Sequence, residues 1–132
     1  MKQNRLGRSE LMVGEIGLGC MSLGTDEARA RSIIDEAIEL GINFFDTADL
    51  YDHGVNEQLL GQALKGRRNR VVLATKVGNR RVPGEAGWRW DPSKAYIKAA
   101  VHESLRRLQT DYIDLYQLHG GTIDDPIDET IE

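Results

Sequence analysis

Three short apolar runs recur along the chain, and amphipathic stretches separate them. The runs are nearly continuous and rich in β-branched or aromatic residues, as expected for strands that are covered on both faces of a parallel sheet. They are Ile42–Ala48 (INFFDTA), Val71–Val77 (VVLATKV) and Tyr112–Leu118 (YIDLYQL). A weaker run, Glu15–Gly19, precedes them. We expect Leu6–Val13, with its turn at Gly7 and Arg8, to pair with this weaker run as a hairpin outside the main sheet.

Start and stop signals bound a helix in each interval between the runs. Thr25 or Asp26 can cap the first helix, and Gly41 suits the left-handed turn after it. The second is expected over Asn56–Lys65, where leucines and an alanine share one face. Asp91-Pro92 predicts the third, with aspartate as the cap and proline at the first helical position, and this helix continues through Leu108.

The predicted order is therefore strand, helix, strand, helix, strand, helix, strand. Such alternation implies right-handed crossovers and a parallel sheet, which either an open doubly wound sheet or a (β/α) barrel would satisfy. Asp124–Glu132 (DDPIDETIE) contains another Asp-Pro helix start just before the last residue. Four βα units are half of an eight-fold barrel, which needs about 250 residues. We therefore expect one domain over residues 1–132, a half-barrel truncated within its fourth helix.

Composition and charge argue against several classes of protein. The 132 residues are 40% hydrophobic and 29% charged, as in an ordinary globular domain. A net charge of −4 disfavours a nucleic-acid binder, and the basic stretch Lys65–Arg70 is interpreted as a solvated loop. Neither a signal peptide nor a membrane span is expected. The lone Cys20 cannot form an internal disulfide, which fits a reducing compartment, so we expect a cytoplasmic protein.

Four reactive side chains follow the ends of the predicted strands. Asp46, Lys76 and His119 lie at three successive strand exits, and Tyr51 lies in the loop after the first of them. Each could have a structural explanation alone, such as a turn residue or a solvated charge. In parallel α/β folds, however, the carboxyl ends of the strands gather on one rim, where ligands bind. We therefore expect the four side chains to converge.

Their chemistry suits the reduction of a carbonyl group. A tyrosine phenol with an ordinary pKa of about 10 is a poor acid, but a nearby ammonium group would favour the phenolate. An aspartate beside the lysine would keep the ammonium charged and oriented. Such a tyrosine can protonate a carbonyl oxygen that gains negative charge, and a neutral histidine can orient the same oxygen.

The motifs that carry these residues resemble the signatures of the aldo-keto reductases. They are FDTADLY (45–51) with NEQLLGQAL (56–64), ATK (74–76), DYIDLYQLHG (111–120) and the early RLGRSELMVGEIGLGCMSLG (5–24). The resemblance spans essentially the whole chain. It implies a (β/α)₈ TIM barrel, NADPH as the usual hydride donor, and aldehydes or ketones as substrates. It also implies a catalytic tetrad of Asp46, Tyr51, Lys76 and His119.

The same resemblance implies contacts with the cofactor. It places Gly19, Cys20 and Met21, at the exit of the first strand, beside the nicotinamide together with Asp46. The family binds the pyrophosphate and the 2′-phosphate mainly through the second half of the barrel, which this chain does not contain. Two alternatives to an enzyme therefore remain. One is a non-catalytic cofactor-binding or regulatory subunit, and the other is a structural half-barrel that self-associates through its open edges.

Several other residues are assigned more ordinary roles. Two glycines in GLG lack the third glycine of a dinucleotide fingerprint, and neither His53 nor His102 has partners at metal-ligand spacing, so no metal site is predicted. The loop Gly78–Trp90 is expected on the catalytic rim. Its Trp88 and Trp90 are either loop anchors or walls of the substrate pocket, and we favour the pocket. We expect Tyr96 and Tyr116 to lie in the core. Asp49 is interpreted as a loop residue without a catalytic role.

Overall fold

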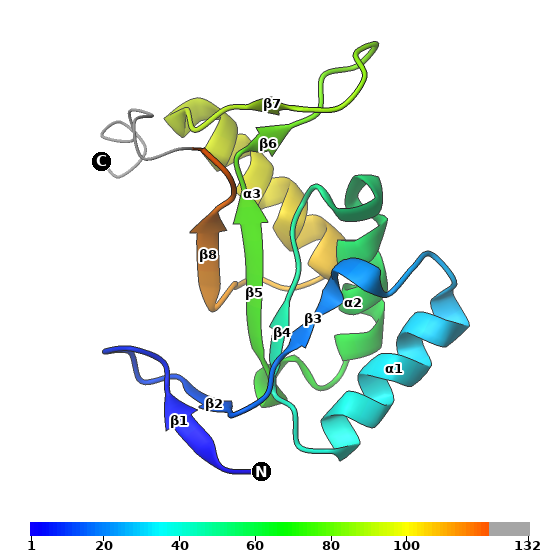
Figure 1. Cartoon of the computed structure of the whole chain (residues 1–132), viewed down its shortest axis with the longest axis vertical. Coiled ribbons are helices and arrows are strands. Elements are labelled where there is room, and N and C mark those ends of the chain that lie inside the picture. Colours follow the sequence, from blue (N-terminus) through cyan, green and yellow to red (C-terminus); the bar gives the residue numbers. More distant parts are fainter. Residues whose placement is uncertain (122–132) are drawn as a thin grey trace.

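A four-stranded parallel sheet forms the centre of the molecule (Figure 1). The computed structural model describes residues 1–121, and the strand order is β3-β4-β5-β8. These strands cover Leu18–Gly19, Phe44–Asp46, Val72–Val77 and Leu115–Leu118. All four predicted strands are therefore present, although each is shorter than its apolar run.

Three helices cover one face of the sheet (Figure 1). α1, α2 and α3 span Glu27–Glu39, Val55–Leu64 and Lys94–Leu108. Three short 3₁₀ turns, η1, η2 and η3, span Cys20–Ser22, Tyr51–Gly54 and Arg68–Arg70. The predicted alternation of strands and helices is confirmed. Of the helices in the described part of the chain, none has both the length and the apolar character needed to cross a membrane.

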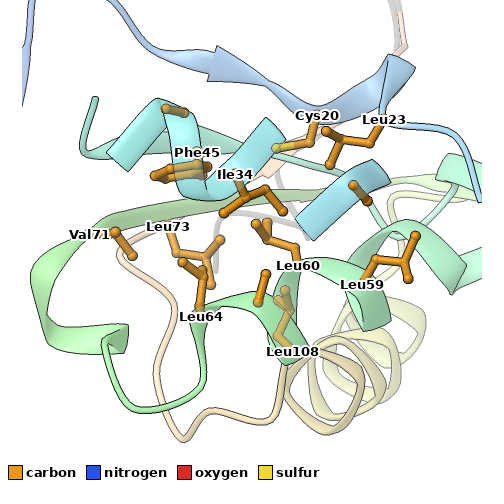
Figure 2. Close-up of a cluster of buried hydrophobic side chains, with 13 residues drawn as sticks. Cys20, Leu23, Ile34, Phe45, Leu59, Leu60, Leu64, Val71, Leu73 and Leu108 are labelled. Atoms are coloured by element: carbon orange, nitrogen blue, oxygen red, sulfur yellow. The ribbon is translucent and has the colours of Figure 1, made fainter. Parts of the chain in front are cut away.

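The hydrophobic core lies between the sheet and the helices (Figure 2). Phe45 of β4 and Leu73 of β5 point to the helices and are fully buried, as is Ile34 of α1. Alternate residues of the same strands, Asp46 and Ala74, must face the other way, because side chains alternate across a strand. The sheet therefore has one face that packs against the helices and an inner face that carries the ionisable groups.

The N-caps of α1 and α3 test the predicted helix starts. Asp26 caps α1, and its carboxylate accepts a hydrogen bond from the N–H of Arg29 at 2.9 Å. The predicted cap of α3 is wrong, because Ser93 is the N-cap and Pro92 precedes the helix. Asp91 instead accepts a bond from the N–H of Ser93, a local turn that competes with capping.

The N-terminal hairpin differs from the predicted one. Its strands are β1 (Gln3–Arg5) and β2 (Met12–Gly14), whereas the run at Glu15–Gly19 supplies β3, which pairs in parallel with β4. Asn43 joins the hairpin to the start of β4, since its amide accepts from the N–H of Gly14 and donates to the carbonyl of Met12. The hairpin lies at the amino ends of the strands, opposite the predicted rim (Figure 1).

The loop predicted over residues 78–90 contains a second small hairpin. Its strands are β6 (Asn79–Arg80) and β7 (Arg89–Trp90), and it extends from the carboxyl end of β5 (Figure 1). An ion pair between Arg80 and Asp91 stabilises its base. The helix predicted to start within Asp124–Glu132 lies outside the described residues.

A buried polar network joins β5 to α2 and α3 on the helical side of the sheet. The carboxylate of Glu57, which is 0% exposed, accepts hydrogen bonds from the Thr75 hydroxyl and from Nε of Arg107, both at 2.7 Å. Arg107 also contacts Ser104 and packs against Gly54, where a Cβ would lie 2.9 Å from its Cδ. The network thus links the helices to the loop that follows β4.

Candidate active site

The predicted residues gather at the carboxyl ends of the strands. Asp46 ends β4, Lys76 is the penultimate residue of β5, and His119 directly follows β8. Tyr51 begins η2, the short turn after β4. The expected convergence of these four side chains on one rim is what the structure shows.

Asp46 and Lys76 form a direct ion pair on the inner face of the sheet. Lys76 Nζ lies 2.8 Å from Asp46 Oδ2 and also donates to the carbonyl oxygen of Thr47 at 2.9 Å. The lysine side chain is 15% exposed and the aspartate side chain 31%. Two acceptors in a partly buried site fix the direction of the ammonium group, because charge-assisted hydrogen bonds are stronger than neutral ones.

The Tyr51 ring lies close to both the lysine and the histidine. Its centroid is 5.3 Å from Lys76 Nζ and 5.9 Å from the centroid of the His119 ring, which it meets edge to face at 87°. The side chains of Asp46, Lys76, Tyr51 and His119 therefore form one continuous cluster, here called the tetrad. A phenol, an ammonium group and an imidazole that lie this close can act on one small molecule.

The loop that positions Tyr51 has an uncommon backbone. Asp52 and His53 have φ values of 48° and 55°, in the left-handed region that residues other than glycine rarely adopt, and Gly54 follows at 90°. Such conformations persist only where the surroundings enforce them, and they are typical of functional sites. Arg107, anchored by Glu57, packs against Gly54 and provides that support.

The surroundings of His119 favour its neutral form. Burial lowers its pKa below the ordinary value of 6.5, the positive charge of Lys76 lowers it further, and only Asp46 opposes them. Its Nδ1 atom is buried without a hydrogen-bond partner in the described part of the chain. A neutral imidazole keeps one N–H that can donate to a substrate oxygen.

This electrostatic coupling gives a testable pH dependence. We expect Lys76→Met to raise the pKa of His119 and Asp46→Asn to lower it, as followed by NMR titration of the imidazole signals. Because the folded-state pKa lies below the unfolded value, His119 destabilises the fold as the pH falls below about 6.5 and has no such effect at pH 8. Lys65→Met, which changes an exposed lysine at the far end of α2, is the control. Equal shifts in all three variants would contradict the coupling.

The residues predicted beside a nicotinamide occupy the exit of β3. Gly19 is the register partner of Asp46, and no atom lies within 4 Å of where its Cβ would be. Met21 is 64% exposed, whereas Cys20 is buried in the core (Figure 2). Burial raises the pKa of the Cys20 thiol to about 12, so the thiol stays protonated. Cys20 can therefore contribute only backbone groups to a site.

The two tryptophans of the rim differ in their surroundings. Trp88 is 56% exposed, and Trp90 is half-buried against the glycines that follow His119, where a Cβ on Gly121 would lie 2.4 Å from its ring. Nε1 of Trp90 is buried without a partner among the described residues. Trp90 thus lies beside the glycines that follow His119, while Trp88 extends towards solvent.

Sequence reasoning missed two features of this region. Gln117 of β8 donates a hydrogen bond to Asp46 Oδ1 at 3.0 Å, although the sequence only marked it as a strand residue. Asp49 lies in the loop after β4 as predicted, but burial and the charge of Glu57 raise its pKa to about 6. Tyr96 and Tyr116, predicted to lie in the core, are half-buried, and burial raises the pKa of both phenols.

Neither His53 nor His102 lies in a group of metal-ligating side chains. Both are exposed, and residues 1–121 contain no cluster of three or more His, Cys, Asp or Glu side chains that could hold a metal ion.

Comparisons with known proteins identify chains of similar sequence and fold. The chain is 66% identical over 132 residues to the uncharacterized oxidoreductase YqkF of Bacillus subtilis (strain 168). Among solved structures, it is similar to the holo form of the aldo-keto reductase AKR11C1 from Bacillus halodurans, with a TM-score of 0.95 and 72% identity over 99% of this chain. It also resembles the glycerol dehydrogenase AKR11B4 from Gluconobacter oxydans, with a TM-score of 0.86 and 31% identity over 97% of this chain.

These relatives are all longer than the chain. It spans 43% of the length of YqkF, 44% of AKR11C1 and 42% of AKR11B4. The predicted fold class is confirmed, because the described residues correspond to the N-terminal half of an aldo-keto reductase barrel. The model of the aldo/keto reductase family matches residues 15–132, and the chain belongs to that family of oxidoreductases.

Proposed function

We propose that this half-barrel carries the catalytic groups of an NADPH-dependent reductase that converts aldehydes or ketones to alcohols in a complete barrel. The observation that carries the proposal is the tetrad itself. Lys76 Nζ lies 2.8 Å from Asp46 Oδ2 and 5.3 Å from the centre of the Tyr51 ring, and the centre of the His119 ring lies 5.9 Å from the same point. A protein that only bound a cofactor would have no need for this combination, which argues against a regulatory subunit.

In this proposal, each tetrad residue has a separate task. Tyr51 donates a proton to the carbonyl oxygen as negative charge develops there. Lys76 provides the positive charge beside the phenol, and Asp46 holds the ammonium group in place. His119, neutral because of its lowered pKa, donates a hydrogen bond that orients the same oxygen.

Open space beside Gly19 supports a nicotinamide site at the exit of β3. No atom of the described residues lies within 4 Å of where a Cβ of Gly19 would be, and Gly19 lies next to Asp46 of the tetrad in the sheet. NADPH would supply the hydride for the carbonyl carbon when bound there. Gly19, Met21, Asp46 and the backbone of Cys20 would hold the ring, and Trp90 with Trp88 would line the side where the substrate enters.

The chain's one cysteine agrees with a reducing compartment, so we assign the enzyme to the cytoplasm. Cys20 is free and buried, and the described residues contain no disulfide. We also propose that residues 1–132 form a single structural unit of the barrel.

The proposal is tested with a complete barrel. The part of AKR11C1 that follows its match to Glu132 would be joined to this chain, and this fusion is called the chimeric barrel below. We expect NADPH absorbance at 340 nm to fall when benzaldehyde is added. Glyceraldehyde would be tested as a second aldehyde, because one relative is a glycerol dehydrogenase. Native AKR11C1 is the reference for folding and assay. A folded chimeric barrel that oxidises neither NADPH nor NADH would contradict the proposed reductase, and one that oxidises NADH but not NADPH would contradict the proposed cofactor.

The free edges of the sheet favour a second property for the chain alone. β3 and β8 each have only one neighbouring strand in the described sheet, and unpaired edges are sites of association. We infer that the 132-residue chain self-associates when it is not part of a complete barrel. Light scattering checks this inference, and a well-folded monomer would contradict it.

A further inference from the structure

The Asp46 carboxylate has a different partner on each oxygen. Oδ2 accepts from Lys76 Nζ at 2.8 Å, and Oδ1 accepts from Gln117 Nε2 at 3.0 Å. A carboxylate held at one oxygen can still rotate about its Cβ–Cγ bond, whereas a second donor on the other oxygen fixes its plane. The amide of Gln117 therefore determines how the carboxylate faces the ammonium group.

The sheet is built so that Gln117 can reach Asp46. Gln117 lies on β8 opposite Lys76 of β5, and Asp46 lies on β4, on the other side of β5. Between Asp46 and β8, the register places Ala74 on β5, with its side chain on the same face. Ala74 is 0% exposed and carries only a methyl group, which leaves room for the glutamine side chain to cross above it.

A neutral donor is suited to this position. A lysine or arginine here would bring a second positive charge that competes with Lys76 for the carboxylate. A carboxylate at residue 117 would repel Asp46, and an apolar residue would leave Oδ1 without this donor. Glutamine orients Asp46 without changing the net charge of the site.

We propose that Gln117 is a positioning residue, which acts through Asp46 and Lys76 on proton donation by Tyr51. The inference rests on the proposed function. In the described part of the chain, the Gln117 side chain donates to Asp46 and forms no hydrogen bond with the Tyr51 phenol or the His119 imidazole, so its effect passes through the Asp46 carboxylate. Loss of its amide should therefore change turnover more than the binding of substrate or cofactor.

The first test uses Gln117→Met, which keeps the length of the side chain and removes the donor. In the chimeric barrel, we expect kcat to fall about 10-fold, the effect of one hydrogen bond to a charged group, with the KM for NADPH unchanged. Gln62→Met, at an exposed glutamine of α2, is the matched control and should leave kcat unchanged. Circular dichroism confirms that both variants fold.

The second test uses Gln117→Glu and measures how kcat depends on pH. A purely structural role of Gln117 would not change this dependence. A protonated glutamic acid can still donate to Asp46, whereas its carboxylate repels it. We expect the kcat of Gln117→Glu, relative to the parent, to fall as the pH rises from about 5 to 7, while the same ratio for Gln117→Met stays constant. In the 132-residue chain itself, Asp46→Asn should shift the side-chain amide signal of Gln117 in NMR spectra.

The outcomes separate the two proposals. If the parent chimeric barrel folds but shows no turnover, the proposed function fails, and the positioning role fails with it. If the parent is active and Gln117→Met keeps the parental kcat, only the positioning role is overturned. A pH-independent ratio for Gln117→Glu, or an unmoved Gln117 amide signal in Asp46→Asn, overturns it as well.

Discussion

Tyr51→Phe is expected to lower the turnover of the chimeric barrel by about 100- to 10,000-fold, the usual contribution of a positioned general acid. The substitution removes one oxygen and keeps the ring that packs edge to face against His119 at 5.9 Å. The proton donor is therefore lost while the shape of the site is preserved. Steady-state oxidation of NADPH at saturating aldehyde measures the effect, and the KM for NADPH should change little.

Tyr112→Phe is the matched control for this substitution. Tyr112 is 42% exposed, and its ring contacts the guanidinium of Arg68 rather than any tetrad residue. We expect this variant to keep the parental turnover. If Tyr51→Phe also keeps it, the proton donor is another group, and the roles proposed for Lys76 and Asp46 lose their basis.

The order of the elements and the convergence of the tetrad were predictable from the sequence. Both depend on strong and local signals, namely apolar runs of strand length and the rule that parallel strands end on one rim. Asp46, Lys76 and His119 could be placed because each lies at the end of such a run. The same pattern identified Tyr51, since only a short loop separates it from β4.

Contacts between distant residues were not predictable in the same way. Gln117 reaches Asp46 because β5 lies between their strands and carries alanine where the glutamine side chain crosses it. This arrangement depends on the register of the strands, which cannot be read from the composition. The cap of α3 was wrong because Asp91 and Ser93 are both good capping residues, and Arg80 draws Asp91 into an ion pair. The contact with Arg80 thus helps to determine which of two suitable residues caps the helix.

The buried network of Glu57, Thr75 and Arg107 could also not be predicted from the sequence. Glu57 lies in a helical pattern where a charged residue is ordinarily solvated, and Arg107 is 50 residues away. Their pairing depends on the close packing of α2 against α3, at Gly61, where a Cβ would lie 2.7 Å from the backbone of Leu108. The pair in turn supports Gly54 and the strained turn that presents Tyr51. Stability and the candidate site are thus coupled through one arginine.

Arg107→Leu is therefore expected to lower the free energy of unfolding by about 3 kcal/mol, because it leaves the Glu57 carboxylate without its counter-ion in a fully buried position. Urea denaturation of the chimeric barrel, followed by circular dichroism, measures the loss. We also expect turnover to fall, since the support of Gly54 is removed together with the ion pair.

Arg106→Leu provides a control one residue away in the same helix. Arg106 is 68% exposed, and within residues 1–121 it pairs only with Glu103 on the surface of α3, where solvent screens the charges, so the urea midpoint should stay unchanged. The double variant Glu57→Leu with Arg107→Leu should be more stable than Arg107→Leu alone, because no uncompensated charge remains in the core. Equal losses for Arg106→Leu and Arg107→Leu would show that helix α3, and not the buried pair, determines the result.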